Sequence, residues 1–162
     1  DMGKAILKPA EIPVLAEGED FVARTISVNG EDYTVTCVSM GNPHCIVFCN
    51  NPKDIPLEQI GPHFEHHALF PERINTEFLQ VIDETTLNMR VWERGSGETW
   101  ACGTGACATA VACHLNGKTG RTVEVELVGG TLIIEWREAD NHVYMTGPAE
   151  FSFDGVWLRE VE

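Results

Sequence analysis

The sequence has 162 residues, of which 43% are hydrophobic, with 11 Lys and Arg against 25 Asp and Glu. This length suits one domain with a sizeable apolar core. The formal net charge of −14 disfavours nucleic acid and anionic membranes as partners, because their phosphates would be repelled. No apolar run approaches the roughly 20 residues that cross a bilayer.

The cysteines are expected to carry reduced thiols. A chain of this length with this apolar content does not need disulfides to fold. The sequence opens on Asp1-Met2-Gly3-Lys4, which is neither an initiator methionine nor a signal peptide. We therefore expect a cytoplasmic protein and a fragment of a longer chain. The six cysteines are Cys37, Cys45, Cys49, Cys102, Cys107 and Cys113.

Strand and turn signals dominate the first half of the chain. Residues 21–28 alternate in polarity and lead into Asn29-Gly30, which predicts a type I′ hairpin. Pro52 and Pro56 separate a short apolar strand from a short amphipathic helix. The predicted elements are strands over residues 21–28, 31–39 and 45–49, a helix over 57–66, and strands over 75–83 and 87–93.

A second helix is predicted over residues 103–115, where it ends at Asn116-Gly117. Its apolar residues are small and lie on nearly every side, which indicates a helix buried all round. Because hairpins join most strands, we predict an α+β fold with an antiparallel sheet rather than alternating β-α-β units. The remaining strands are predicted over residues 122–128, 131–136, 142–146 and 151–158.

The most informative segment is residues 92–108, which places Cys102 and a Gly-Thr-Gly run at the start of the second helix. The first turn of a helix offers free backbone N–H groups and the positive end of the helix dipole. This environment binds carboxylates and lowers the pKa of a thiol. A thiol in such a place, facing a concave opening, suits proton transfer at the carbon next to a carboxylate.

Three other site types compete with this one. Residues 103–108 fit the loose dinucleotide pattern G-x-G-x-x-A, but a loop rather than an apolar strand precedes them. The cysteines lack C-x-x-C spacing, and the histidines within residues 63–67 are typical of a solvated helix face, so neither a metal nor a cofactor is expected. A Cys-His hydrolase with Cys102 as nucleophile and His44 as base remains open.

Three motifs resemble the diaminopimelate epimerase family. Residues 93–106, Glu-Arg-Gly-Ser-Gly-Glu-Thr-Trp-Ala-Cys-Gly-Thr-Gly-Ala, are similar to its second cysteine signature. Residues 40–45, Met-Gly-Asn-Pro-His-Cys, and 73–78, Arg-Ile-Asn-Thr-Glu-Phe, also match. The resemblance implies a cofactor-independent epimerase of diaminopimelate, in lysine and peptidoglycan synthesis. It also implies an antiparallel β-barrel-like sheet wrapped around the Ala-rich helix, with one further short helix.

The resemblance further implies two similar lobes, with the substrate between them and one cysteine from each lobe facing its α-carbon. One cysteine removes the proton as a thiolate while the other delivers a proton to the opposite face. Cys102 is then the acid/base of this lobe, and Gly103 and Thr104 are backbone donors to the α-carboxylate. His44 and Glu93 are similar to groups that tune the thiol pair.

The remaining substrate contacts are also implied by the resemblance. Glu93 and Arg94 are similar to the pair that engages the amino and distal carboxylate groups of diaminopimelate. Asn42 and Asn75 resemble the asparagines that recognise the distal end. Without the resemblance, each asparagine would be interpreted as an ordinary turn residue at the start of a strand.

The family's first signature, a Cys-Gly-Asn-Gly segment in the other lobe, is absent from this sequence. We therefore expect residues 1–149 to form the C-terminal lobe, and residues 150–162 to form a terminal strand that in the family returns to the missing N-terminal lobe. Alone, the fragment is expected to be inactive, and its terminal strand could pair in a homodimer. Two alternatives stay open: a related racemase of another amino acid such as proline, or a non-catalytic binding domain of the same fold.

Overall fold

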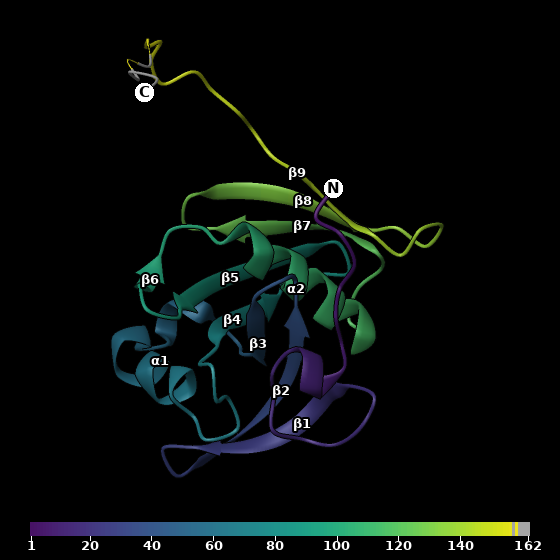
Figure 1. The fold of residues 1–162 in the computed structure, drawn as a ribbon, viewed down its shortest axis with the longest axis vertical. Coiled ribbons are helices and arrows are strands. Elements are labelled where there is room, and N and C mark those ends of the chain that lie inside the picture. Colours follow the sequence, from purple (N-terminus) through teal and green to yellow (C-terminus); the bar gives the residue numbers. More distant parts are fainter. Residues whose placement is uncertain (157, 159–162) are drawn as a thin grey trace.

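A computed structural model describes residues 1–156 and residue 158. In this part of the chain nine strands form one sheet, and two α-helices pack against it (Figure 1). The helices are α1 (Leu57–Glu65) and α2 (Gly103–Leu115), with two 3-10 turns, η1 (Pro9–Glu11) and η2 (Pro52–Asp54). The strands are β1 (Phe21–Val28), β2 (Glu31–Ser39), β3 (Pro43–Phe48), β4 (Asn75–Val81), β5 (Thr86–Glu93), β6 (Gly97–Thr99), β7 (Thr122–Leu127), β8 (Gly130–Trp136) and β9 (Val143–Thr146).

The sheet is mixed and open. Its strand order is β1-β2-β3-β4-β5-β7-β8-β9, and β6 pairs with β5 beside this path. Most neighbours are antiparallel, but β3 pairs with β4 and β5 pairs with β7 in parallel. The α+β class is thus confirmed, whereas the expectation of an antiparallel, barrel-like sheet is wrong. Within the described residues, β1 and β9 are the two edges and do not meet.

Each parallel pair is joined through a helix. α1 lies between β3 and β4 in the sequence, and α2 lies between β5 and β7. Parallel strands require such long crossovers, whereas a tight turn suffices for antiparallel strands. Residues 75–79 of β4 are buried at every position, because the strand is covered on both faces and loses the alternation typical of a one-sided sheet. For this reason the prediction of an antiparallel sheet, which rested on hairpin signals, did not include the two parallel crossovers.

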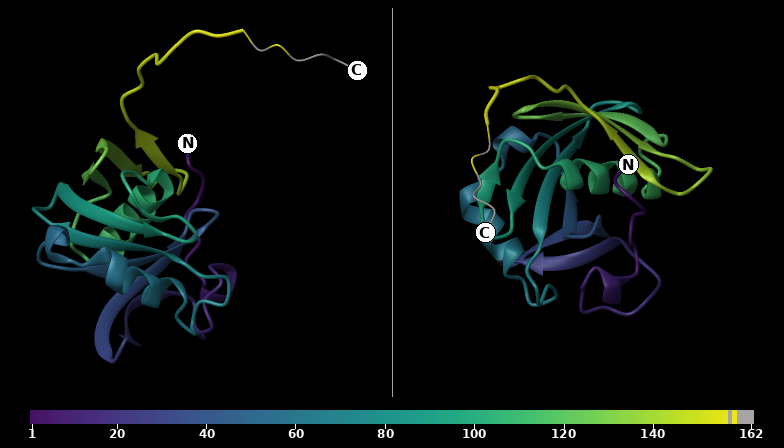
Figure 2. Two further views of the ribbon diagram at one scale, coloured as in Figure 1. Left: turned by 90° about the vertical axis from the view of Figure 1, so that its left-hand side faces the viewer. Right: turned by 45° about the horizontal axis from the view of Figure 1, so that its top comes forward.

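The two helices lie on opposite faces of the sheet. α2 lies within its curved face, where it contacts strands from β2 and β3 to β8 and β9 (Figure 2). Residues 105–113 of α2 are all buried, which confirms a helix enclosed on every side. On the other face, Phe64 of α1 packs edge-on against Phe78 of β4. Small side chains in α2 allow the surrounding strands to approach its backbone closely.

Two local features connect the ends of the sheet. Asn29 and Gly30 have φ values of 52° and 85°, so the predicted type I′ turn between β1 and β2 is confirmed. The N-terminal segment crosses the open side of the sheet: Lys4 bridges to His142 beside β9, and Ile6 bridges to Ser39 of β2. This segment therefore spans the gap that a closed barrel would fill with paired strands.

The end of the chain differs from its prediction. Residues 151–156 and 158 have no regular secondary structure, so the strand expected over residues 151–158 is not formed there. Residues 157 and 159–162, which belong to the predicted terminal segment, lie outside the described residues. The side chains of Phe151 and Phe153 are 100% and 86% exposed. Pairing of this segment in a homodimer therefore stays a prediction. None of the helices in the described ranges is long and apolar enough to cross a membrane.

Candidate active site

The candidate residues gather at one end of the central strands. β3 and β4 start side by side, with His44 opposite Asn75 in the parallel register. β5 runs antiparallel to β4, so Glu93, its last residue, lies at the same end. Cys102 precedes α2 and brings its sulfur within 4.8 Å of ligand atoms of His44 and Glu77. Four separate elements thus converge on one place.

Cys102 caps the first turn of α2. The backbone N–H of Gly105 donates to its Sγ at 3.3 Å, and the Thr104 hydroxyl lies 3.5 Å from the same sulfur. Gly103 and Thr104 are the first two residues of the helix, so their N–H groups have no partner within the helix. The thiol thus lies beside amide donors, and its role as an acid/base stays a prediction. The residue is only 7% exposed, however, so its thiol is more enclosed than the open mouth that the sequence suggested.

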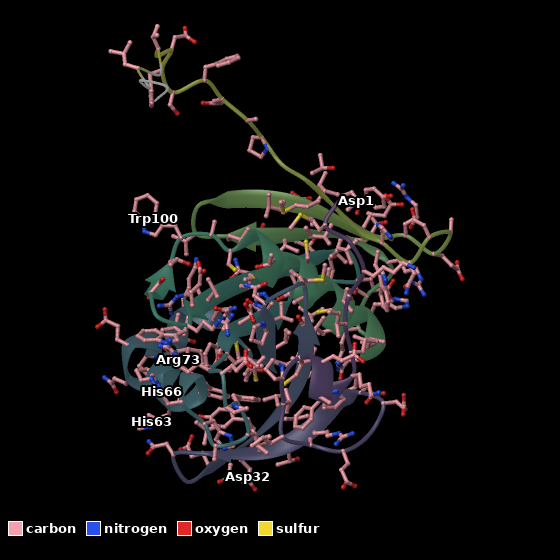
Figure 3. The ribbon with its side chains drawn as sticks, in the orientation of Figure 1. Asp1, Asp32, His63, His66, Arg73 and Trp100 are labelled. Atoms are coloured by element: carbon pink, nitrogen blue, oxygen red, sulfur yellow. The ribbon has the colours of Figure 1, made fainter. Side chains whose placement is uncertain are left out.

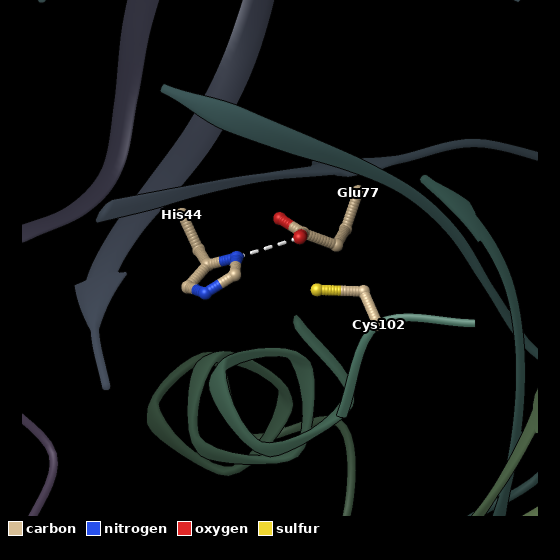
Figure 4. A group of neighbouring side chains, drawn as sticks. All are labelled: His44, Glu77 and Cys102. Carbon is tan, nitrogen blue, oxygen red and sulfur yellow. Dashed lines mark hydrogen bonds and ion pairs between the residues drawn. The ribbon is translucent and has the colours of Figure 1, made fainter. Parts of the chain in front are cut away.

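The thiol of Cys102 faces a buried polar pair (Figure 4). Nδ1 of His44 and Oε1 of Glu77 are 2.7 Å apart, and both side chains are fully buried. His44 and Glu77 alternate with Ile46 and Leu79, which pack on α2, so all four side chains point to the α2 face of the sheet. His44 therefore lies beside Cys102, and its implied role in tuning the thiol stays a prediction.

Glu77 is the residue that sequence reasoning missed. Its only signal in the sequence was its place inside the motif of residues 73–78, because a carboxylate beside the polar residues Asn75 and Thr76 does not by itself indicate a buried position. Its second oxygen, Oε2, is buried without a hydrogen-bond partner among the described residues. Glu77 is thus part of the same cluster as His44 and Cys102.

The pKa of the Cys102 thiol is raised to about 11. Burial is the largest cause, and the negative charge of Glu77 comes next; hydrogen bonds from Thr104 and the Gly105 amide lower the pKa by less. Burial and a nearby like charge both disfavour the thiolate. The expectation that the helix start lowers this pKa is therefore wrong, because burial and the charge of Glu77 outweigh the effect of the helix.

The two asparagines make contacts within the protein. Nε2 of His44 lies 3.1 Å from Oδ1 of half-buried Asn42. Asn75 is 2% exposed; its Nδ2 donates to the Pro43 carbonyl and its Oδ1 accepts from the Arg94 amide, both at 2.9 Å. Asn75 therefore ties β3 to the loop after β5. Its proposed recognition of a substrate stays a prediction.

Glu93 is the last residue of β5, and Arg94 begins the loop between β5 and β6. The carboxylate of Glu93 accepts from the Thr99 hydroxyl, and its charge raises the pKa of Cys102. The Arg94 guanidinium donates to the Glu72 carbonyl at 3.0 Å. The charge of Glu93 therefore acts on the Cys102 thiol, while the Arg94 side chain extends toward the segment before β4.

The histidines on α1 are separate from this cluster. His63 and His66 are exposed at the outer side of α1 (Figure 3), and Nε2 of His67 contacts the Ser27 carbonyl at 3.0 Å. The interpretation as a solvated face is thus confirmed for His63 and His66, whereas His67 is half-buried. Cys102, His44 and Glu77 contain the atom types that bind zinc, but Nδ1 of His44 already contacts Glu77. The expectation of a metal-free site stays a prediction.

Comparisons with known proteins identify the relatives of this chain. A family profile described as diaminopimelate epimerase matches residues 36–152. The diaminopimelate epimerase of Acetivibrio thermocellus is 59% identical over 162 residues, which cover 99% of this chain and 58% of that protein. That of Desulfovibrio desulfuricans is 60% identical over 163 residues, covering 97% and 57%. The chain spans little more than half the length of these curated relatives.

Among solved structures, the Bacillus anthracis phenazine biosynthesis protein of the PhzF family aligns with 75% of this chain and 40% of its own, at 22% identity and a TM-score of 0.49. That likeness is too distant to bear on function. The family match covers all three motifs that surround the thiol, from Met40 to Ala106. This chain therefore belongs to the diaminopimelate epimerase family.

Proposed function

We propose that this chain is the C-terminal lobe of an enzyme that interconverts LL- and meso-diaminopimelate, with Cys102 as one of two acid/base cysteines. The supporting observation is the position of Cys102: its sulfur sits at the N-terminus of α2 beside a backbone amide. The amides of Gly103 and Thr104 are free to bind the α-carboxylate of a substrate. They would stabilise the negative charge that develops when the neighbouring C–H bond breaks.

The proposed reaction transfers one proton in and one proton out. A thiolate from the other lobe takes the α-proton, and the electrons of the C–H bond are delocalised into the α-carboxylate. The thiol of Cys102 gives its proton to the opposite face of the carbon and becomes a thiolate. Its pKa of about 11 supports this starting role, because such a group is protonated at neutral pH. In the reverse direction the two cysteines exchange roles.

The other groups hold the substrate in this proposal. Glu93 and Arg94 engage its amino and distal carboxylate groups, and Asn42 contributes to recognition of the distal end. Asn75 acts with them by fixing the Arg94 backbone at 2.9 Å. No cofactor is needed, since both proton carriers are side chains. We also propose a cytoplasmic location, where these thiols stay reduced.

The partner cysteine is proposed to lie in the lobe that this chain lacks. The chain covers 57–58% of its relatives, which supports an enzyme of two parts. Incubated alone with diaminopimelate in deuterated water, the chain should not invert the α-carbon. Efficient α-deuteration with inversion would contradict this proposal.

A hybrid enzyme tests the function of the lobe directly. This chain would replace the matching part of the Desulfovibrio desulfuricans enzyme, which is 60% identical to it. We expect the hybrid to epimerise diaminopimelate, and Cys102→Ser to lower kcat by roughly 10²–10⁴-fold. The matched control is Cys113→Ser, since Cys113 is buried at the other end of α2. A folded hybrid without epimerase activity would favour a silent domain, and one that racemises only proline would favour another racemase. Either result, or an active hybrid whose kcat is unchanged by Cys102→Ser, would overturn the proposal.

A further inference from the structure

We propose that Glu65, at the end of α1, is a positioning residue that fixes the loop carrying Glu93 and Arg94. What this loop binds rests on the function proposed above. Glu65 lies on the opposite face of the sheet from Cys102, and none of the three motifs includes it. Glu65 is nevertheless only 4% exposed. Its carboxylate accepts hydrogen bonds from groups in two other segments of the chain.

The packing of α1 places Glu65 at this loop. A Cβ atom on Gly61 would lie 2.3 Å from the Trp92 ring, so the helix backbone touches the indole where Gly61 has no side chain. Glu65 is four residues later and lies on the same side of the helix. Its Oε2 accepts the indole N–H of Trp92 at 2.7 Å. The ring of Trp92 therefore sets the distance and rotation of α1 against β5.

The other oxygen of Glu65 holds the loop itself. Oε1 accepts the backbone N–H of Gly95 at 2.8 Å and lies 3.2 Å from a guanidinium nitrogen of Arg73. The preceding amide, that of Arg94, donates to Asn75 at 2.9 Å. Two consecutive amides of the loop thus donate to two different buried side chains. This arrangement fixes the peptide planes from which the Glu93 and Arg94 side chains extend.

The carboxylate chemistry at position 65 is specific. A carboxylate only accepts hydrogen bonds, whereas the glutamine side chain offers one acceptor oxygen and one NH₂ donor. In Glu65→Gln the NH₂ group would face an indole or amide N–H, and one donor would lose its partner. Buried donors without a partner are costly. Glu65 is therefore suited to its three donors, Trp92, Gly95 and Arg73, in a way that an isosteric amide is not.

Acid titration of the isolated chain tests the contact without any activity. Burial raises the pKa of Glu65. The hydrogen bonds from Trp92 and Gly95 and the positive charges of His66 and Arg73 together lower it by more, so the pKa lies below the ordinary value. In ¹⁵N NMR spectra we expect the Gly95 amide and the Trp92 indole N–H resonances to move together below roughly pH 4.3, the ordinary pKa of Glu. Glu65→Gln should abolish that shared transition. Independent transitions, or none in the wild type, would overturn the proposal.

The hybrid enzyme tests the consequence for the substrate. Glu65→Gln should raise KM for diaminopimelate by roughly tenfold, the value expected for losing one hydrogen bond to a charged group, with a smaller change in kcat. Glu65→Asp, which keeps the charge, should restore part of the affinity. The control is Glu98→Gln, because Glu98 pairs with Arg90 at 2.8 Å in the same hairpin without contacting the loop.

The two tests separate this inference from the proposed function. If the unmodified hybrid is inactive while the shared titration is present, the proposed function fails and the contact stands. If the hybrid is active and Glu65→Gln leaves KM at the level of Glu98→Gln, the positioning role fails and the function stands. Thermal unfolding of each variant identifies any loss caused by misfolding, and the wild-type titration requires no variant.

Discussion

Nδ1 of His44 and Oε1 of Glu77 meet at 2.7 Å in a fully buried part of the sheet, beside the sulfur of Cys102. Within the part of the chain that the structure describes, the second Glu77 oxygen has no hydrogen-bond partner. A buried carboxylate with one unpaired oxygen is unfavourable for folding. Its negative charge also makes the neighbouring thiolate harder to form. Glu77 therefore connects the stability of the sheet to the chemistry of Cys102.

Glu77→Gln should make Cys102 more reactive. The amide removes the negative charge but keeps an oxygen that can accept from His44. With a lower pKa, more of the Cys102 thiol is ionised at pH 8.5, about tenfold more for each unit of pKa. Alkylation of the Cys102 peptide by iodoacetamide, followed by mass spectrometry, measures the rate. Glu98→Gln serves as the control for a surface carboxylate, and equal rates in the two variants would contradict the role of Glu77.

The reactivity of wild-type Cys102 should keep rising at alkaline pH. Its pKa of about 11 leaves it protonated where an ordinary thiol, with a pKa of about 8.5, is already ionised. The alkylation rate should therefore still increase between pH 9 and pH 10. The same thiol in the urea-unfolded chain is the reference and should level off near pH 9.5, one unit above the ordinary pKa. A plateau below pH 9 in the folded chain would exclude the raised pKa.

The folded chain should lose stability as the pH rises above about 8.5, the ordinary pKa of a thiol. Burial raises the pKa of Cys107 and Cys113 to about 12, as it raises that of Cys102 to about 11. A group with a raised folded pKa contributes its full stability below its unfolded pKa and loses it as the pH climbs toward the folded value. Each such thiol should lower the free energy of unfolding by about 1.4 kcal/mol per pH unit in this window.

Urea unfolding at pH 8 and pH 10, with a reductant present, measures this loss. Cys107→Ala and Cys113→Ala should each flatten the pH dependence, even though each also removes some packing. Cys49→Ala is the comparison and should flatten the pH dependence less, because Cys49 is only half-buried. An unchanged slope in the Cys107→Ala, Cys113→Ala double variant would assign the alkaline loss to other groups.

Local sequence signals predicted the elements that depend on neighbouring residues. The bounds of α2, Gly103–Leu115, follow from small residues between a Gly-Thr-Gly start and an Asn-Gly stop. The β1–β2 hairpin follows from Asn29-Gly30, since both residues adopt the positive φ that this turn requires. Such features are decided within a few residues, and the sequence contains all the relevant information.

Local sequence signals could not predict the features that depend on contacts between distant segments. The parallel pairing of β3 with β4 requires α1 to cross over the sheet, and no local pattern specifies where a chain returns. β6 has only three residues, too few for a periodic signal. The pKa of Cys102 was misjudged for the same reason: the helix start is visible in the sequence, whereas burial and Glu77 come from the packed sheet.

Gly105→Ala should disturb the site through close packing. A Cβ atom at this position would lie 2.6 Å from Oε1 of Glu77 and 3.1 Å from Sγ of Cys102. Glu77 has little room to move, because it is fully buried and bonded to His44. Overpacking of this kind costs about 1–3 kcal/mol, which outweighs the helix preference of alanine over glycine, about 1 kcal/mol. Thermal or urea unfolding should therefore show a net loss of stability.

Gly120→Ala is the matched control for Gly105→Ala, because a Cβ atom at Gly120 meets nothing within 4 Å. It should change the free energy of unfolding by less than about 0.5 kcal/mol, as surface substitutions usually do. Combining Gly105→Ala with Glu77→Ala tests the mechanism further. Glu77→Ala removes the side-chain atoms that the new Cβ would meet, so if this clash is the cause, the effects of the two changes should not add. Strict additivity would show that Gly105 is required for some other reason than the approach of Glu77 to the start of α2.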